Sequence, residues 1–213
     1  MTEVVDQGTG RTRWKRFGIA FVPAVAAGAA LAIMVANGAL AVSFAVSGSQ
    51  FKVSADRLTG DGFSQFGSID KGVGDTDYHA VVVSVVDDNA ELTNLCQSVS
   101  IPIPGPLQPI LGSHKIIKIT AGGGNSPATA DNLVVDMTNL TASSADFNNM
   151  RIGQDASTLG VNSIVSPDPS AGAFAQASDS VDIRNLQQTA WATTAGTFTL
   201  PGLSLGFSDT ECF

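Results

Sequence analysis

The chain has 213 residues, enough for one domain with its own hydrophobic core and a targeting segment. Charged residues make up only 14 % of it, against roughly 25 % in ordinary soluble domains, which disfavours surface helices and suits short strands and turns. The first 42 residues hold four basic and two acidic residues, and the remaining seven basic and seventeen acidic residues give that part a net charge of −10. So acidic a domain has no basic surface for nucleic acid or anionic lipid, and no nucleic-acid partner is expected.

The N-terminus reads as a membrane-targeting segment. Residues 1–16 form a basic, cytoplasmic N-terminus that ends in Arg11-Thr-Arg-Trp-Lys-Arg16, and no charged residue occurs from Gly18 to Gln50. The apolar run within 17–43 is long enough to span a bilayer as one helix, with membrane contact over residues 17–41. Basic residues before such a helix predict that everything after it lies outside the membrane.

Two fates of this segment stay open. It is either an uncleaved transmembrane signal anchor, which leaves the main domain on the cell membrane, or a signal peptide. Ala39-Leu40-Ala41 fits a signal-peptidase site, and cleavage after Ala41 would secrete the domain. The apolar core is longer than signal peptides usually have, which favours the anchor.

Residues 44–213 are predicted to form an extracytoplasmic, all-β domain. A short pattern that alternates apolar and polar residues recurs in it, at Val53–Leu58, Val135–Leu140, Val181–Leu186 and, more weakly, Ala90–Leu95. Alternation of this kind indicates a half-buried strand. Stacked copies would bury a face that one unit cannot, which predicts repeated strand units in a β-solenoid or β-sandwich-like fold. The alternative is a chance recurrence in a chain rich in Thr, Asn and Val.

Individual strands follow from composition. His79–Val86 is predicted as a strand buried on both faces, Lys115–Thr120 as a strand with one wet face, and Thr197–Phe207 as an apolar strand that closes the domain. Ile101–Leu111 alternates proline with large aliphatic residues and is predicted as an extended loop or sheet edge, because proline cannot donate to a central ladder.

The two cysteines, Cys96 and Cys212, lack the spacing of a zinc or thioredoxin-like site. In an oxidising compartment they predict one disulfide, and two buried free thiols are the alternative. The bridge would bring the apolar stretches 101–111 and 200–207 together. They would then form a docking surface or, alternatively, ordinary core; its members are Ile101, Ile103, Leu107, Ile110, Leu203, Leu205 and Phe207.

Catalytic signals are weak. Gly202-Leu-Ser-Leu-Gly206 matches the nucleophile-elbow string of esterases, but none of the seven residues after Gly206 is His, and they are too few for the helix that the motif requires. His79 and His114 lie far upstream, and the acidic pairs Asp75/Asp77 and Asp87/Asp88 lack calcium-loop spacing. No catalytic, metal or cofactor residue is predicted.

The stretches Ala36–Gly48 and Phe51-Lys-Val-Ser-Ala-Asp-Arg-Leu58, together with the late Cys-Phe end, resemble a family of uncharacterised exported, membrane-anchored actinobacterial proteins. Some of its members carry the label cholesterol esterase. The resemblance implies a Gram-positive cell envelope and a multi-spanning membrane protein as a partner. It supplies no catalytic motif.

The function expected from these observations is a non-enzymatic structural or binding protein of the cell envelope, displayed outside the membrane. An envelope-associated lipid or ester hydrolase is the alternative. A lipid, a membrane protein or a second copy of the chain are the partners that the apolar stretches would suit.

Overall fold

The structure is a computed structural model, and it describes residues 49–72, 78–161 and 169–213. The predicted membrane segment at 17–43 lies outside these residues. Within them, no helix is long and apolar enough to cross a membrane. The strands are β1 (Phe51–Lys71), β2 (Tyr78–Thr93), β3 (Leu95–Pro102), β4 (His114–Ala121), β5 (Ala128–Asp131), β6 (Leu133–Thr141), β7 (Ser144–Asn148), β8 (Arg151–Asp155), β9 (Phe174–Thr194), β10 (Thr197–Thr199) and β11 (Ser204–Ser208). The helical turns are η1 (Gly105–Leu107), α2 (Gln108–Leu111) and η2 (Ala156–Thr158).

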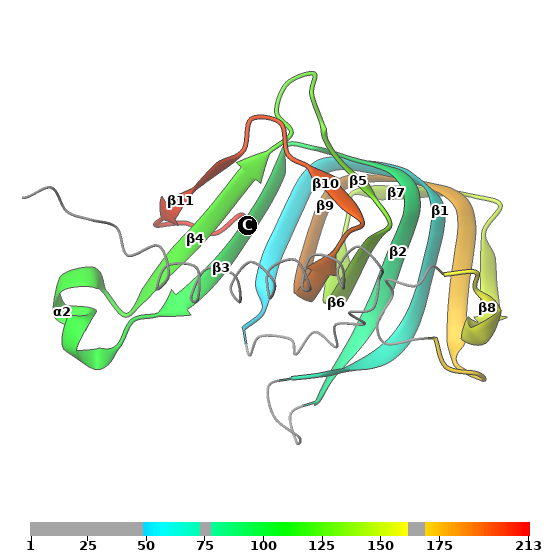
Figure 1. The fold of residues 1–213 in the computed structure, drawn as a ribbon, viewed down its shortest axis with the longest axis horizontal. Coiled ribbons are helices and arrows are strands. Elements are labelled where there is room, and N and C mark those ends of the chain that lie inside the picture. The colour runs from blue at the N-terminus through cyan, green and yellow to red at the C-terminus, as the bar shows by residue number, and fades with distance from the viewer. Residues whose placement is uncertain (1–48, 73–77, 162–168) are drawn as a thin grey trace, which may run out of the picture. The chain divides into compact units, whose positions relative to one another are not determined.

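Two long antiparallel hairpins build the sheet. In the first, β2 and β3 follow one another along β1, from the pair Lys71↔Tyr78 to the pair Lys52↔Ser98. In the second, β6, β7 and β8 follow one another along β9. Strands β1 and β9 pair with each other, and β2 pairs with β6, so the pairings run from β1 through β2, β6 and β9 back to β1. Figure 1 shows these long strands bent around the core.

Asparagines mark the places where the strands break or bend. Five of them adopt positive φ, a conformation that Asn tolerates better than most residues, and Asn94 and Asn185 are two of these five. The side-chain amide of Asn94 donates to Asp56 at 2.6 Å, and that of Asn185 donates to Ser143 at 2.9 Å. The first bond ties the junction of β2 and β3 to β1, and the second ties β9 to the junction of β6 and β7.

The repeated sequence pattern is therefore partly a corner signature. In two of its copies the Asn has positive φ, at the break between β2 and β3 for Asn94 and within β9 for Asn185, and the following Leu95 or Leu186 enters the core at 1 % exposure. The all-β prediction is confirmed. All the strand pairs described are antiparallel and belong to one 11-stranded sheet, so the copies lie in neighbouring strands of that sheet rather than in stacked coils of a solenoid.

The core has two parts. The larger cluster lies between β1, β2, β3, β5, β6 and β9 and includes the fully buried Leu95, Ile183 and Leu186. A smaller cluster on the opposite side of β2 gathers Phe66, Val83 and Val85.

Two strand predictions need correction. His79–Val86 lies in β2, but Ala80 and Val82 are exposed, because only the opposite face of that segment packs on the smaller cluster. Thr197–Phe207 is not one strand: β10 and β11 lie at opposite ends of the sheet, separated by a turn at Pro201-Gly202 with positive φ at the glycine. The Lys115–Thr120 strand is confirmed as part of β4.

Candidate functional site

Strands β3, β4 and β11 form a projecting three-stranded end of the sheet, called here the wing. β4 lies between β3 and β11, and the segment with η1 and α2 forms its tip (Figure 1). From Ile101, near the end of β3, to Ser113, just before β4, no residue is charged. The wing thus carries both apolar stretches that the sequence singles out.

Register separates the wing into two faces, because side chains alternate along a strand. On one face Val99 lies opposite Ile117, which lies opposite Phe207. In the next row on that face, Ile119 lies beside Leu205. This apolar face is largely open to solvent at its edge, where Leu205 is 65 % exposed and Phe207 77 % exposed.

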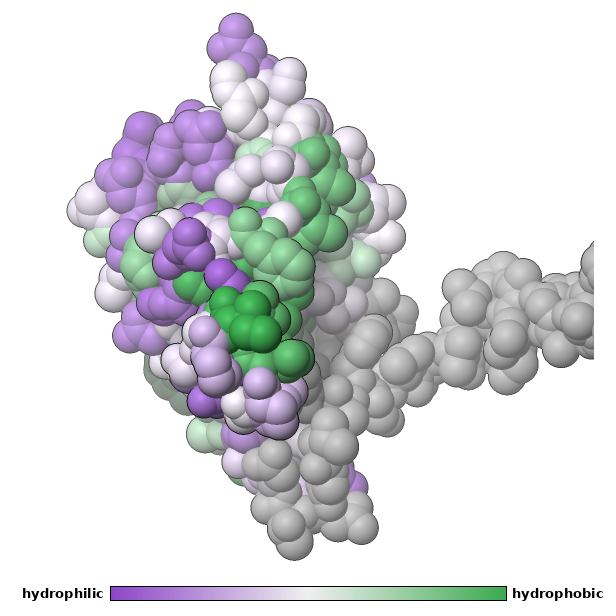
Figure 2. Space-filling view, turned by 90° about the vertical axis from the view of Figure 1, so that its left-hand side faces the viewer, coloured by the Kyte–Doolittle hydropathy of each residue, from purple (hydrophilic) through white to green (hydrophobic). Residues whose placement is uncertain are grey.

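The next row toward the tip holds Ile101 beside Lys115, which forms an ion pair with Asp209, and beyond this row the tip is apolar again. Leu107, Ile110 and Leu111 are exposed there, Ile110 by 80 %. Figure 2 looks onto this end of the molecule and shows hydrophobic surface gathered on it. Exposed apolar patches on soluble proteins are typical of contact sites for proteins, membranes or ligands, which makes this surface a candidate docking site.

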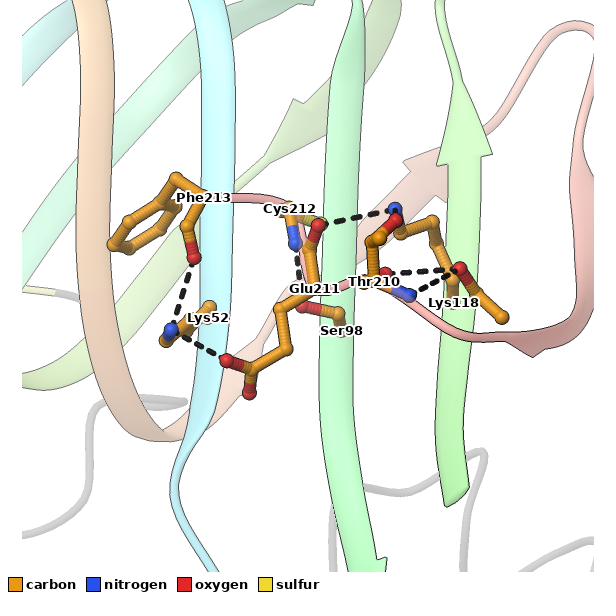
Figure 3. A network of polar contacts seen from close by, with 8 residues as sticks. Lys52, Ser98, Lys118, Thr210, Glu211, Cys212 and Phe213 are labelled. Carbon is orange, nitrogen blue, oxygen red and sulfur yellow. Dashed lines mark hydrogen bonds and ion pairs between the residues drawn. The ribbon is translucent and has the colours of Figure 1, made fainter. Parts of the chain in front are cut away.

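The opposite face of the wing is covered by the C-terminal tail. Cys96 on β3 is joined to Cys212 by a disulfide, as predicted, with 5.9 Å between the two Cα atoms. The backbone N–H of Cys212 donates to the hydroxyl of Ser98 at 3.0 Å, and Ser98 lies on the same face as Cys96 (Figure 3).

Two lysines hold the rest of the tail. Lys118 of β4 donates to the main-chain oxygen of Glu211 at 3.1 Å. Lys52 of β1 forms an ion pair with the Glu211 carboxylate and donates to the main-chain oxygen of Phe213 at 2.9 Å (Figure 3). The tail thus covers the polar face, and the apolar face is left uncovered by it.

The predicted surface residues lie on the wing, at its tip and in the turn that precedes β11. Ile101, Leu107, Ile110, Leu203, Leu205 and Phe207 are exposed, and Ile103 is half-buried. Their exposure favours a surface over ordinary core, and docking through that surface stays a prediction. The disulfide does not bring the two apolar stretches into direct contact, because β4 lies between β3 and β11. Sequence reasoning missed that β4 adds Ile117 and Ile119 to the same face, a signal already present in the alternation of its residues.

A buried acidic group forms a second feature, on β1, β2 and β6. Asp136 is 6 % exposed, and its burial, with a smaller contribution from Asp70, raises its pKa to about 7. Burial also raises the pKa of Asp70, while His79, opposite Asp70 in the β1–β2 register, lowers it. The His79 ring stacks on Trp191 with 3.7 Å between ring centroids. Sequence reasoning considered His79 and missed Asp136.

A polar cavity of about 190 Å³ lies where β1, β2 and β8 meet. It is lined by the buried Ser64, by Gln154 and by Asp87, whose pKa burial raises. Gly62 makes room for the Asp87 carboxylate, since a Cβ there would lie 2.7 Å from its oxygen. Such a cavity can hold water or a small polar molecule. The apolar space within the larger core cluster is only about 30 Å³, enough for one water.

The candidate nucleophile Ser204 is a strand residue. It lies in β11 opposite Thr120, and among the described residues no helix follows it. His114 begins β4, six positions from Thr120, which places it roughly 20 Å away along the strand. Within the described residues, no group of three or more His, Cys, Asp or Glu side chains could hold a metal ion.

Comparison with known proteins gives one match. A family model described as a family of unknown function, DUF6230, matches residues 47–213. No curated protein and no solved structure matches the chain. The match covers the whole β-rich part described above, and the chain therefore belongs to the DUF6230 family.

Proposed function

We propose that this protein is a non-enzymatic binding module of the cell envelope, displayed outside the membrane, whose wing docks on a lipid surface. The observation that carries the proposal is the apolar face and tip of the wing, with Ile110, Leu205 and Phe207 at least 65 % exposed. Leaving such side chains in water is unfavourable, since full burial of one of them contributes about 1.5–3 kcal/mol.

The shape of the tip supports a membrane rather than a soluble partner. The segment from Ile101 to Ser113 has no charge, contains four prolines and presents its aliphatic side chains at a projecting end of the sheet. Uncharged apolar tips can enter the boundary between headgroups and acyl chains without burying a charge.

Charge selects the kind of lipid. The part of the chain after residue 42 has a net charge of −10, so an anionic surface would repel it. Apolar insertion into a zwitterionic surface avoids that repulsion. The predicted segment at 17–41 would keep the domain beside the membrane, with residues 44–213 outside.

Orientation is tested by protease shaving of intact cells that produce the full chain with an N-terminal tag. The domain should be digested while the tag survives. A domain that resists shaving and is cut only after lysis would refute the placement.

Docking is tested separately by a protease site introduced between residues 43 and 48 of the full chain. After cleavage, the released domain should remain bound to phosphatidylcholine vesicles. Leu107→Asp and Leu203→Asp should each release it, because both side chains are exposed on the wing. Ile152→Asp, an exposed position on β8, is the matched control and should leave binding unchanged. Unfolding of both wing variants, or equal release by the control, would overturn the proposal.

A further inference from the structure

Strand β11 forms one edge of the sheet. In the described part of the chain it pairs only with β4, so the hydrogen-bonding groups of its other edge have no strand partner there. Proteins usually protect such an edge with short strands, charged side chains, proline or a bulge. β10, at the other end of the sheet, has only three residues. β11 has five, without charge or proline, and two of them are exposed apolar residues.

The sequence of β11 is nearly symmetric about its centre. It reads Ser204-Leu-Gly-Phe-Ser208, with Gly206 in the middle. In an antiparallel pair of two such strands centred on Gly206, Ser204 lies opposite Ser208 and Leu205 lies opposite Phe207. A two-fold contact requires this self-complementarity, in which residue i meets j and j meets i.

From this symmetry we infer that β11 pairs antiparallel with β11 of a second copy of the chain. The contact joins two wings into one continuous six-stranded sheet. Leu205 of each copy then packs beside Phe207 of the other, and cross-strand apolar pairs of this kind stabilise sheets. In each copy, Leu205 lies beside Ile119 and Phe207 lies beside Ile117, so the apolar rows extend from the contact into β4 of both copies.

Charge favours this edge as the meeting place. Two identical acidic domains repel each other wherever their charges approach, and a two-fold contact brings the same charges from both sides. Residues 204–208 carry none. The pairing uses the edge of the wing and leaves its apolar face free, so it is compatible with docking on lipid and doubles the apolar face available.

The contact area is small, because only five residues pair on each side, and stable interfaces in solution bury about 1,200–2,000 Å². When the chains are held beside a membrane, their effective concentration near one another rises, and a contact too small for a stable dimer in solution can then form. In this respect the inference rests on the proposed membrane placement, and the full chain in membranes is the form to test.

Cysteine crosslinking tests the pairing and its register. In the full chain, Gly206→Cys should form an intermolecular disulfide, because opposite residues of antiparallel strands have Cα atoms about 4.5–5.5 Å apart, within disulfide range. A side chain at Gly206 meets nothing within 4 Å in the chain itself. Gly67→Cys is the matched control, since Gly67 is also an exposed strand glycine with open space. A dimer band for Gly206→Cys that is no stronger than that of Gly67→Cys would overturn the pairing.

Crosslinking between two cysteine variants that carry different tags tests the register of the pairing. Ser204→Cys in one copy should crosslink to Ser208→Cys in the other. Ser204→Cys should not crosslink to itself, because the two positions would lie roughly 13 Å apart. Self-crosslinking as strong as the mixed product would mean nonspecific association and would contradict the register.

A charge at the two-fold axis gives an independent readout. With Ser204→Cys and Ser208→Cys as reporters, adding Gly206→Asp should abolish the mixed crosslink, since like charges would face each other, and Gly206→Asn should retain it. Equal crosslinking with Gly206→Asp would refute the contact. Vesicle binding of the released domain is measured in parallel, so loss of pairing with retained binding refutes this inference and leaves the lipid-docking proposal standing.

Discussion

Cys96 and Cys212 are bonded on the face of the wing opposite to the one that carries Leu205 and Phe207. The disulfide therefore fixes the C-terminal tail over the polar side of β3 and β4, where Ser98 and Lys118 also hold it. This arrangement leaves the apolar face of the wing uncovered by the tail.

Removing the bridge should cost stability. The two cysteines are 116 residues apart, and in the chain-entropy model closing such a loop stabilises the fold by roughly 4–5 kcal/mol. We expect Cys96→Ser/Cys212→Ser to lower the free energy of unfolding by about that amount in urea titration. Reduction of the unmodified protein should reproduce the loss, and equal stability of the two proteins would contradict the assignment.

Asp136 should make stability depend on pH. Its pKa is about 7 in the folded protein against 3.8 as the ordinary value, so between about pH 4 and pH 7 the folded state holds a proton that the unfolded state lacks. Stability should therefore fall as the pH rises through this window, by on the order of 4 kcal/mol. Asp136→Asn should flatten the curve of unfolding free energy against pH. A variant curve that falls as steeply as that of the unmodified protein would contradict the buried carboxyl.

The corner at Asn185 should require its left-handed backbone. Because φ is +50° there, Asn185→Val should destabilise the fold by about 1–2 kcal/mol more than Asn185→Gly. Asn139 occupies the equivalent position in the copy at 135–140 and does not have a positive φ, so Asn139→Val is the matched control and should be well tolerated. Similar losses at both positions, measured by thermal unfolding, would count against the corner.

Ser204 should not act as a nucleophile. It lies in a strand, and His114 is roughly 20 Å away along β4. A fluorophosphonate probe should leave the full chain unlabelled, with a known serine hydrolase as the positive control. Labelling that disappears in Ser204→Ala would establish the hydrolase alternative instead.

The class of the fold and the disulfide could be predicted from the sequence, because composition, alternation and cysteine count carry that information. The repeated pattern was visible too, but its meaning was not: alternation ending in Asn-Leu is equally typical of a stacked coil and of a bent strand. Only the pairing shows that Asn94, between β2 and β3, and Asn185, in β9, lie on opposite sides of β1 in one sheet.

Other features depend on contacts between distant segments. The break of 197–207 into two strands at opposite ends of the sheet follows from which strands they pair with, which no local pattern specifies. Asp136 is flanked by Val134, Val135 and Met137, all buried, so the run predicts a strand covered on both faces. The sequence pattern alone could therefore have predicted that Asp136 is buried. That Asp70 lies close enough to raise the pKa of Asp136 could be seen only in the structure.

Ile110, at the tip of the wing, reports lipid contact most directly. In the full chain reconstituted in phosphatidylcholine vesicles, a tryptophan placed by Ile110→Trp should be quenched by lipids brominated in their acyl chains. Ile152→Trp, exposed on β8, is the control, and the background from Trp14 and Trp191 is subtracted with the unmodified chain. We expect strong quenching at 110 and little at 152. Equal quenching at the two positions would contradict lipid contact at the tip.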